Sequence, residues 1–194
     1  MEQRSVMAEP TIDERVIEAC QMGDREAFRL LFEAYKDKVF SIAVYSFGGD
    51  KTAASDVSQQ IFLKLINSIR QFRGDSAFST WLYRMVVNAC IDEQRKHGRL
   101  LQFGESAPVT RIEDRRPQEK HFARVEVSDH VQAAISELTP KLRMPILLKY
   151  GEGLSYEEIA EVLECSMGTV ASRLNRGHQS LAKKLSHLRD EVFE

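Results

Sequence analysis

The sequence lacks any long apolar stretch, and this absence excludes a membrane-spanning helix. No segment longer than about ten residues is both uncharged and strongly apolar, whereas a transmembrane helix needs about 20 such residues. The N-terminus, MEQRSVMAEP, also lacks the basic and then apolar order of a signal peptide. We therefore expect a cytoplasmic protein with no direct membrane insertion.

Cysteine is scarce as well. Cys20, Cys90 and Cys165 are odd in number and far apart, so they predict reduced, buried thiols rather than a disulfide framework or a metal-ligand pair. A redox-sensing thiol stays open as an alternative. The histidines show no metal-ligand spacing, and no glycine-rich phosphate loop or Ser/His/Asp set is present. We therefore expect no enzyme, no metal, no cofactor and no small-molecule substrate.

An excess of basic residues is also missing. Lys plus Arg number 27 against 29 for Asp plus Glu, a net charge of −2, whereas proteins that bind DNA unaided are usually basic. The distribution is uneven, however. No acidic residue lies between Glu164 and Asp190, and this interval holds five basic residues: Arg173, Arg176, Lys183, Lys184 and Arg189. A cationic helix within a neutral protein indicates DNA binding in which a partner supplies part of the affinity.

The first half of the chain carries apolar residues at helical spacing and predicts a compact helical bundle. Thr11 with Glu14 predicts a capping box, Gly23 a helix end, and Asp24 and Asp50 the caps of the next two helices. A fourth helix is expected from about residue 78 to 96. The inward face of the second helix is expected to consist of Phe28, Leu31, Phe32, Tyr35, Val39 and Ile42.

Helical periodicity fades in the middle of the chain and then returns. The fold class that follows is all-α, with an N-terminal bundle over 1–97, a flexible linker over 98–127 and a helix-turn-helix domain over 128–194. Extended at about 3.3 Å per residue, the linker could span up to about 100 Å. Its length therefore allows the two domains to bind well-separated places.

The C-terminal segment Leu154–Leu185 has the features of a helix-turn-helix. Ser155 with Glu158 predicts a second capping box, and Ser166 predicts the cap of the long final helix. Val170, Leu174, Leu181 and Leu185 recur at the spacing of a buried face. The opposite face presents polar and basic residues of the kind that contact base edges and phosphates.

This segment resembles the fourth conserved domain of bacterial sigma factors, especially the extracytoplasmic-function (ECF) group, in LSYEEIAEVL and in GTV.SRL.R. The resemblance implies that the final helix reads the minus-thirty-five promoter element through Thr169, Ser172, Arg173 and Arg176. The sequence departs from the family pattern at Glu164, where glycine is common, and at Ala171, Asn175 and Gly177. Glu164 must tolerate the backbone of the turn, and Gly177 lowers helix propensity by about 1 kcal/mol relative to alanine.

A second segment, QFRGDSAFSTWLYRMVVNACIDEQRK, resembles the part of ECF sigma factors that opens the duplex at the minus-ten element. Unstacked bases need aromatic or amide surfaces, and phosphates need cations. The resemblance implies DNA contacts by Arg73, Asp75, Ser76, Ser79, Trp81, Arg84 and Asn88. A competing interpretation assigns Phe78, Trp81, Leu82, Met85 and Val86 to the core, because they fall at helical spacing.

A third segment, DVSQQIF, resembles the family's polymerase-docking helix. Asp56, Gln59 and Gln60 lie on one side of this helix, opposite Val57, Ile61 and Leu65, and the resemblance implies that these polar residues face core polymerase. Gln60 stands where glutamate is usual.

The three resemblances together imply an RNA polymerase sigma factor. Its partners would be core RNA polymerase, promoter DNA and an anti-sigma factor, in a stress or envelope response. The alternative is a helix-turn-helix regulator whose N-terminal bundle senses a ligand or dimerises. That alternative predicts a palindromic operator and a stable homodimer.

Overall fold

The computed structural model describes residues 12–102 and 130–186, and every regular element in these two ranges is helical. The all-α prediction is therefore confirmed, with helical units before and after the central segment. Most of the expected linker, together with Thr11 and the chain beyond residue 186, lies outside the described residues.

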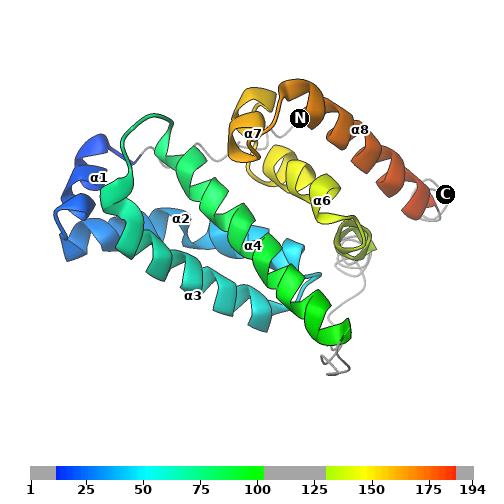
Figure 1. Cartoon of the computed structure of the whole chain (residues 1–194), viewed down its shortest axis with the longest axis horizontal. Helices are drawn as coiled ribbons and strands as arrows, with labels where there is room; N and C mark the ends of the chain where they lie inside the picture. The colour runs from blue at the N-terminus through cyan, green and yellow to red at the C-terminus, as the bar shows by residue number, and fades with distance from the viewer. Residues whose placement is uncertain (1–11, 103–129, 187–194) are drawn as a thin grey trace, which may run out of the picture.

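The N-terminal unit consists of four α-helices and one short 3₁₀ turn (Figure 1). In chain order these are α1 (Glu14–Gln21), α2 (Arg25–Ser46), α3 (Lys51–Ser68), η1 (Ile69–Gln71) and α4 (Phe78–Gln102). The last helix continues beyond its expected end at Lys96 and through Gly98. The bundle therefore extends further along the chain than the sequence pattern indicated.

Helix caps follow the sequence prediction except at the first helix. The carboxylate of Asp24 accepts from the main-chain N–H groups of Glu26 and Ala27, and Asp50 caps α3 in the same way. The expected Thr11–Glu14 capping box is wrong, because α1 begins at Glu14 and is capped by Asp13. Glu14 is therefore the first helical residue, whereas the acidic residue of a capping box lies at the third helical position.

Most of the expected inward face of α2 is buried, including Leu31, Tyr35, Val39 and Ile42. The prediction that Phe32 lies on the same face is wrong, because 42% of its surface is exposed. Successive helical residues differ by about 100° in direction, so Phe32 turns away from Leu31 toward the outer edge of the α2–α3 pair. There its ring meets that of Phe62 with centroids 4.7 Å apart.

The C-terminal unit begins with a helix over 130–136 and continues through four further elements. They are α6 (Pro140–Ile146), the π-helical turn η2 (Leu147–Gly151), α7 (Tyr156–Val162) and α8 (Met167–Lys184). Pro140 starts α6 as expected, the Ser155–Glu158 capping box is formed, and Ser166 caps α8. The predicted helix starts and caps of this half of the chain are thus confirmed.

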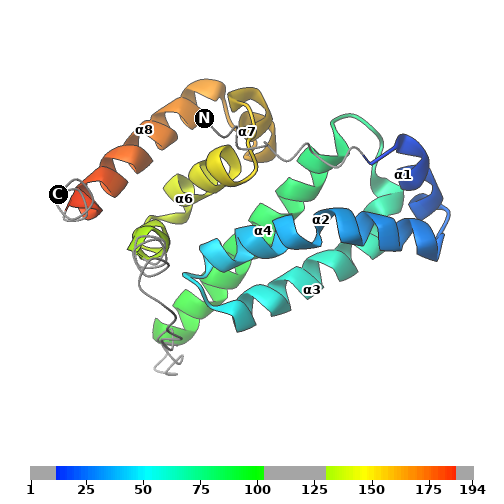
Figure 2. The same ribbon diagram turned by 180° about the vertical axis from the view of Figure 1, so that it is seen from behind.

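The two units pack against each other. The middle of the molecule is formed by α4, which lies beside α7, while the C-terminal end of α2 approaches α6 and η2 (Figures 1 and 2). The buried residues of both units join in one hydrophobic core. The guanidinium of Arg143 in α6 reaches across to the main-chain carbonyl of Ser46, the last residue of α2. The structure is therefore a closed arrangement of the two units.

Candidate nucleic-acid interface

The C-terminal unit contains the two crossed helices of a helix-turn-helix. Helices α7 and α8 pack against each other, and Ile159 and Ala160 of α7 and Val170 and Leu174 of α8 are buried in the core. Between the helices, Glu164 adopts a left-handed backbone with φ 49°, and the N–H of Cys165 donates to the carbonyl of Ala160 at 3.0 Å. The turn thus takes the conformation that favours glycine, and here a glutamate adopts it.

The residues expected to face DNA are carried by α8, which lies at the edge of the molecule farthest from α3 (Figure 1). Ser172 and Arg176 are exposed, whereas Thr169 and Arg173 are half-buried. The Thr169 hydroxyl lies 2.9 Å from that of the capping Ser166. Ser172 and Arg176 are therefore the free part of this surface.

Gly177 has a packing role that the sequence reasoning missed. It is buried, and a Cβ added there would lie 2.7 Å from the Cδ1 atom of Ile146. The glycine therefore permits the close approach of α8 to α6. A signal for this existed in the sequence, since Gly177 falls between Leu174 and Leu181 on the apolar stripe of α8.

The loop between η1 and α4 carries the first group of residues expected at the minus-ten element. Arg73 and Asp75 are exposed, while Ser76 and Ser79 are half-buried. Gly74 between them has φ 77°, a left-handed conformation that glycine adopts without strain. The turn therefore presents a cation and a carboxylate to solvent on either side of Gly74.

Aromatic rings fix both ends of this loop. The ring of Phe72 lies 5.5 Å from that of Phe78 and 5.5 Å from that of Trp81, measured between centroids. Phe78, Leu82, Met85 and Val86 are buried, whereas Trp81 is only half-buried. The assignment to the core is therefore correct for Phe78, Leu82, Met85 and Val86, whereas Trp81 remains partly accessible.

The residues expected to dock on polymerase are exposed along α3. Asp56, Gln59 and Gln60 all face solvent, and Val57, Ile61 and Leu65 on the opposite side are buried. Gln59 also lines a groove of about 500 Å³ between α2 and α3. The groove has apolar walls in which four large side chains are exposed: Phe32, Phe40, Leu63 and Ile66. The sequence did not predict this groove, because residues of two separate helices form it.

Comparison with known families identifies both units. The model of Sigma-70 region 2 matches residues 31–100, and that of Sigma-70 region 4 matches residues 128–181. The chain belongs to the sigma-70 family. It is an RNA polymerase sigma factor of the ECF group, as the resemblance in its sequence implied.

Relatives of this sigma factor match over nearly their whole length. The RNA polymerase sigma-H factor of Pseudomonas aeruginosa is 35% identical over 190 residues, covering 93% of this chain and 97% of the relative. The ECF RNA polymerase sigma-E factor of Escherichia coli K12 is 37% identical over 195 residues, covering 94% and 98%.

Two solved structures share the fold. CnrH, determined in complex with the cytosolic domain of CnrY, superposes with a TM-score of 0.66 at 26% identity and covers 91% of this chain and 98% of its own. RpoE from Bartonella quintana, determined with the anti-sigma factor NepR, has a TM-score of 0.67 at 23% identity, covering 82% and 96%. The helical architecture is thus shared with known sigma factors.

In this sigma factor the closed packing engages residues of both expected DNA surfaces. Arg84 of α4 donates from Nε to the main-chain carbonyl of Glu161 at 2.8 Å, and the neighbouring Tyr83 hydroxyl donates to the Glu152 carboxylate at 2.8 Å. Asn88 and Arg173 line one cavity of about 120 Å³ between the units. The two groups of residues therefore face each other across the interface.

Within 12–102 and 130–186 no cluster of histidine, cysteine and acidic side chains could hold a metal ion. None of the helices placed in these ranges is long and apolar enough to cross a membrane. The thiols of Cys20 and Cys90 are buried, and burial raises the pKa of each to about 11, while Cys165 is half-buried.

Proposed function

We propose that the two units of this sigma factor divide promoter recognition between them. The N-terminal unit recognises and opens the minus-ten element through the loop over 72–77 and α4, and the C-terminal unit reads the minus-thirty-five element through α8. The observation that carries the proposal is the exposed pair Ser172 and Arg176 on a helix without acidic residues. The exposed loop residues Arg73 and Asp75 supply the second surface.

Core polymerase docks, in this proposal, on the exposed side of α3. Asp56, Gln59 and Gln60 provide polar contacts, and the adjacent apolar groove accepts side chains of the partner. An apolar groove of this size exposed beside polar residues is the usual form of a protein-docking surface. In this proposal transcription initiates at the promoter in the cytoplasm, and this chain itself catalyses no reaction.

The free protein is expected to bind duplex promoter weakly, because its closed packing occupies part of both DNA surfaces. The two promoter elements are separated by roughly 60 Å of duplex, so one molecule contacts both only after its units separate. Arg84 must then exchange the Glu161 carbonyl for DNA. Polymerase supplies the remaining affinity, which agrees with a net charge of −2.

A regulatory protein of the anti-sigma class is the further partner that we propose, in a stress or envelope response. Both structures that share the fold were determined as complexes, CnrH with the cytosolic domain of CnrY and RpoE with the anti-sigma factor NepR. In this proposal the regulatory protein holds the two units together where α4 meets the C-terminal unit, beside the cavity of about 120 Å³.

Run-off transcription with purified core enzyme on genomic fragments tests the proposed function. The holoenzyme should produce specific start sites that core enzyme alone does not. Arg176→Ala should lower initiation about tenfold or more, since one good base contact contributes about 1–3 kcal/mol. The matched control is Arg29→Ala, an exposed cation on α2, which should leave initiation unchanged.

Two outcomes would contradict the proposal. If the holoenzyme produced no specific start sites beyond those of core enzyme alone, the proposed promoter-binding sites would be wrong. A symmetric footprint of a stable homodimer on free DNA would favour the helix-turn-helix regulator instead.

A further inference from the structure

The C-terminal end of α1 is tied to the first residue of the loop over 72–77. Gln21, the last residue of α1, donates from its side-chain amide nitrogen to the carbonyl oxygen of Ile69 at 3.2 Å and to that of Phe72 at 2.8 Å. In the opposite direction, Nε of Arg70 donates to the main-chain carbonyl of Gln21 at 3.1 Å. Three hydrogen bonds thus join segments that are about fifty residues apart in sequence.

The chemistry of a glutamine side chain suits this position. A primary amide nitrogen carries two hydrogens, so each of the two carbonyls can receive one. Glutamate could not donate to either carbonyl, and asparagine is one carbon shorter. The bond from Arg70 also places a cation at the C-terminal end of α1, where the helix dipole favours positive charge. The donor and acceptor sets of Gln21 and Arg70 are therefore complementary.

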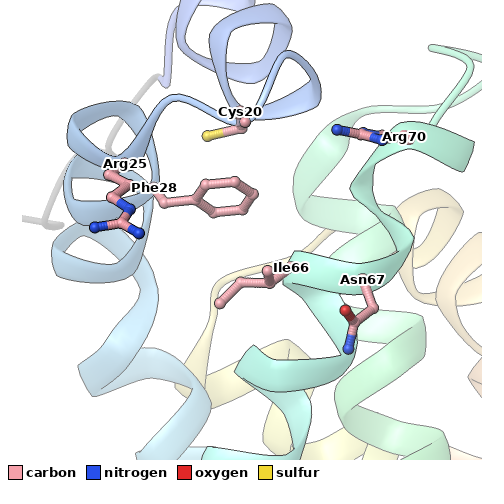
Figure 3. Close-up of a pocket in the computed structure, with 7 residues that line it drawn as sticks. Cys20, Arg25, Phe28, Ile66, Asn67 and Arg70 are labelled. Carbon is pink, nitrogen blue, oxygen red and sulfur yellow. The ribbon is translucent and has the colours of Figure 1, made fainter.

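Packing does not fill this edge of the bundle. A pocket of about 520 Å³ separates α1 and the start of α2 from the end of α3 and η1 (Figure 3). Its walls include Cys20, Arg25, Phe28, Ile66, Asn67 and Arg70. The hydrogen bonds of Gln21 and Arg70 therefore join the two sides next to an opening that side chains do not fill.

The other contacts of Phe72 explain why its carbonyl matters. Its ring packs against those of Phe78 and Trp81 at the start of α4. The first residue of the loop is therefore in contact with the helix that follows the loop. Fixing the Phe72 carbonyl determines the direction in which the chain leaves toward Arg73 and Asp75. Sites that bind with precision require such support behind the contacting residues.

We propose that Gln21 is a positioning residue for promoter opening: its amide, together with Arg70, holds the loop over 72–77 in the geometry that receives the minus-ten bases. Helix α1 precedes residue 31, where the match to Sigma-70 region 2 begins, so the proposal extends the working part of the N-terminal unit to α1. It rests on the proposed function of the loop.

Two variants test the proposal in the full-length chain and its holoenzyme. Gln21→Ala removes both donors, and Gln21→Glu keeps the size but replaces the donors by acceptors. Amide hydrogen exchange over 72–77 should become faster in both. On a promoter found by run-off transcription, permanganate reactivity of the opened thymines should fall about tenfold, as expected for two lost hydrogen bonds. Affinity for core enzyme should stay unchanged, which a general loss of structure would not allow.

Control variants separate failure of this proposal from failure of the proposed function. Glu18→Ala, an exposed change on the same helix, should leave exchange and opening as in the unmodified protein. Unchanged exchange over 72–77 in both Gln21 variants would overturn the positioning role. Normal opening by the Gln21 variants would overturn it as well, if Arg73→Ala impairs opening. If Arg73→Ala opened the promoter normally too, the loop over 72–77 would not be the site of minus-ten recognition, and the proposed function would be wrong.

Discussion

Arg143→Met tests how much stability one buried guanidinium gives by joining the start of the C-terminal unit to itself and to the end of α2. Only 7% of the Arg143 surface is exposed, and burial lowers the pKa of its guanidinium, because desolvation disfavours the charged form. The guanidinium donates at 3.0 Å to the carbonyl of Ile135 and at 2.7 Å to that of Leu138. It also donates to the carbonyls of Ser136 and Ser46. Methionine keeps an unbranched apolar stem, ends where the guanidinium begins and removes every donor.

The magnitude follows from what the four carbonyls retain. The Ser46 carbonyl also accepts from the Gln94 amide at 2.6 Å, and the Ile135 carbonyl also accepts from the N–H of Leu138 at 3.1 Å. For the two others, the described part of the chain provides no second donor. Leaving a buried carbonyl unsatisfied costs about 1–3 kcal/mol, so we expect a loss of about 3 kcal/mol in the free energy of unfolding.

Urea and thermal denaturation followed by far-UV circular dichroism measure this loss. At about 2–4 °C per kcal/mol for a chain of this size, Tm should fall by roughly 6–12 °C. Lys141→Met is the matched control, since Lys141 is an exposed cation on the same helix and its loss should change Tm little. Equal Tm values for the two variants would refute the reasoning, because the Arg143 bonds would then contribute no net stability.

Two further predictions concern the turn of the helix-turn-helix and the thiols. Glu164→Gly should raise the free energy of unfolding by about 0.5–1 kcal/mol. The left-handed backbone costs a non-glycine residue about 1–2 kcal/mol, and the greater entropy of glycine in the unfolded chain offsets part of this gain. A lower free energy of unfolding in urea would contradict the prediction. Cys165 should react first with a thiol reagent at pH 8, while Cys20 and Cys90, whose pKa is raised to about 11, hold only about one thiolate in a thousand and are buried. Labelling of Cys90 in the native protein before Cys165 would show that the interface between the units opens readily.

Much of the local structure could be predicted because its determinants lie within one helical turn. The Ser155–Glu158 capping box and the Asp24 and Asp50 caps each depend on groups two or three residues apart, and the structure confirms all of them. The failures at Phe32 and at the Thr11–Glu14 capping box have a related cause. A strong periodic pattern fixes the apolar stripe of a helix only approximately, and the exact start of a helix depends on which nearby side chain caps it.

The candidate site divides in the same way. The exposure of Arg73, Asp75, Ser172 and Arg176 could be predicted from sequence, and their contacts with DNA stay a prediction. The apolar groove between α2 and α3 could not, because it exists only where two helices lie side by side. The positions of Arg84 and Arg173 at the interface between the units are likewise a property of the packed molecule.

By itself, then, the sequence determined the helices, most of their caps, the helix-turn-helix and the family, because hydrophobic periodicity and capping act between close neighbours in the chain. The tertiary structure decided what lies against what: Gly177 against Ile146, Arg143 on the end of α2, and Gln21 beneath the loop over 72–77. The physical reason is that these contacts join residues far apart in sequence. Their partners are set by how whole helices pack, which no local pattern encodes.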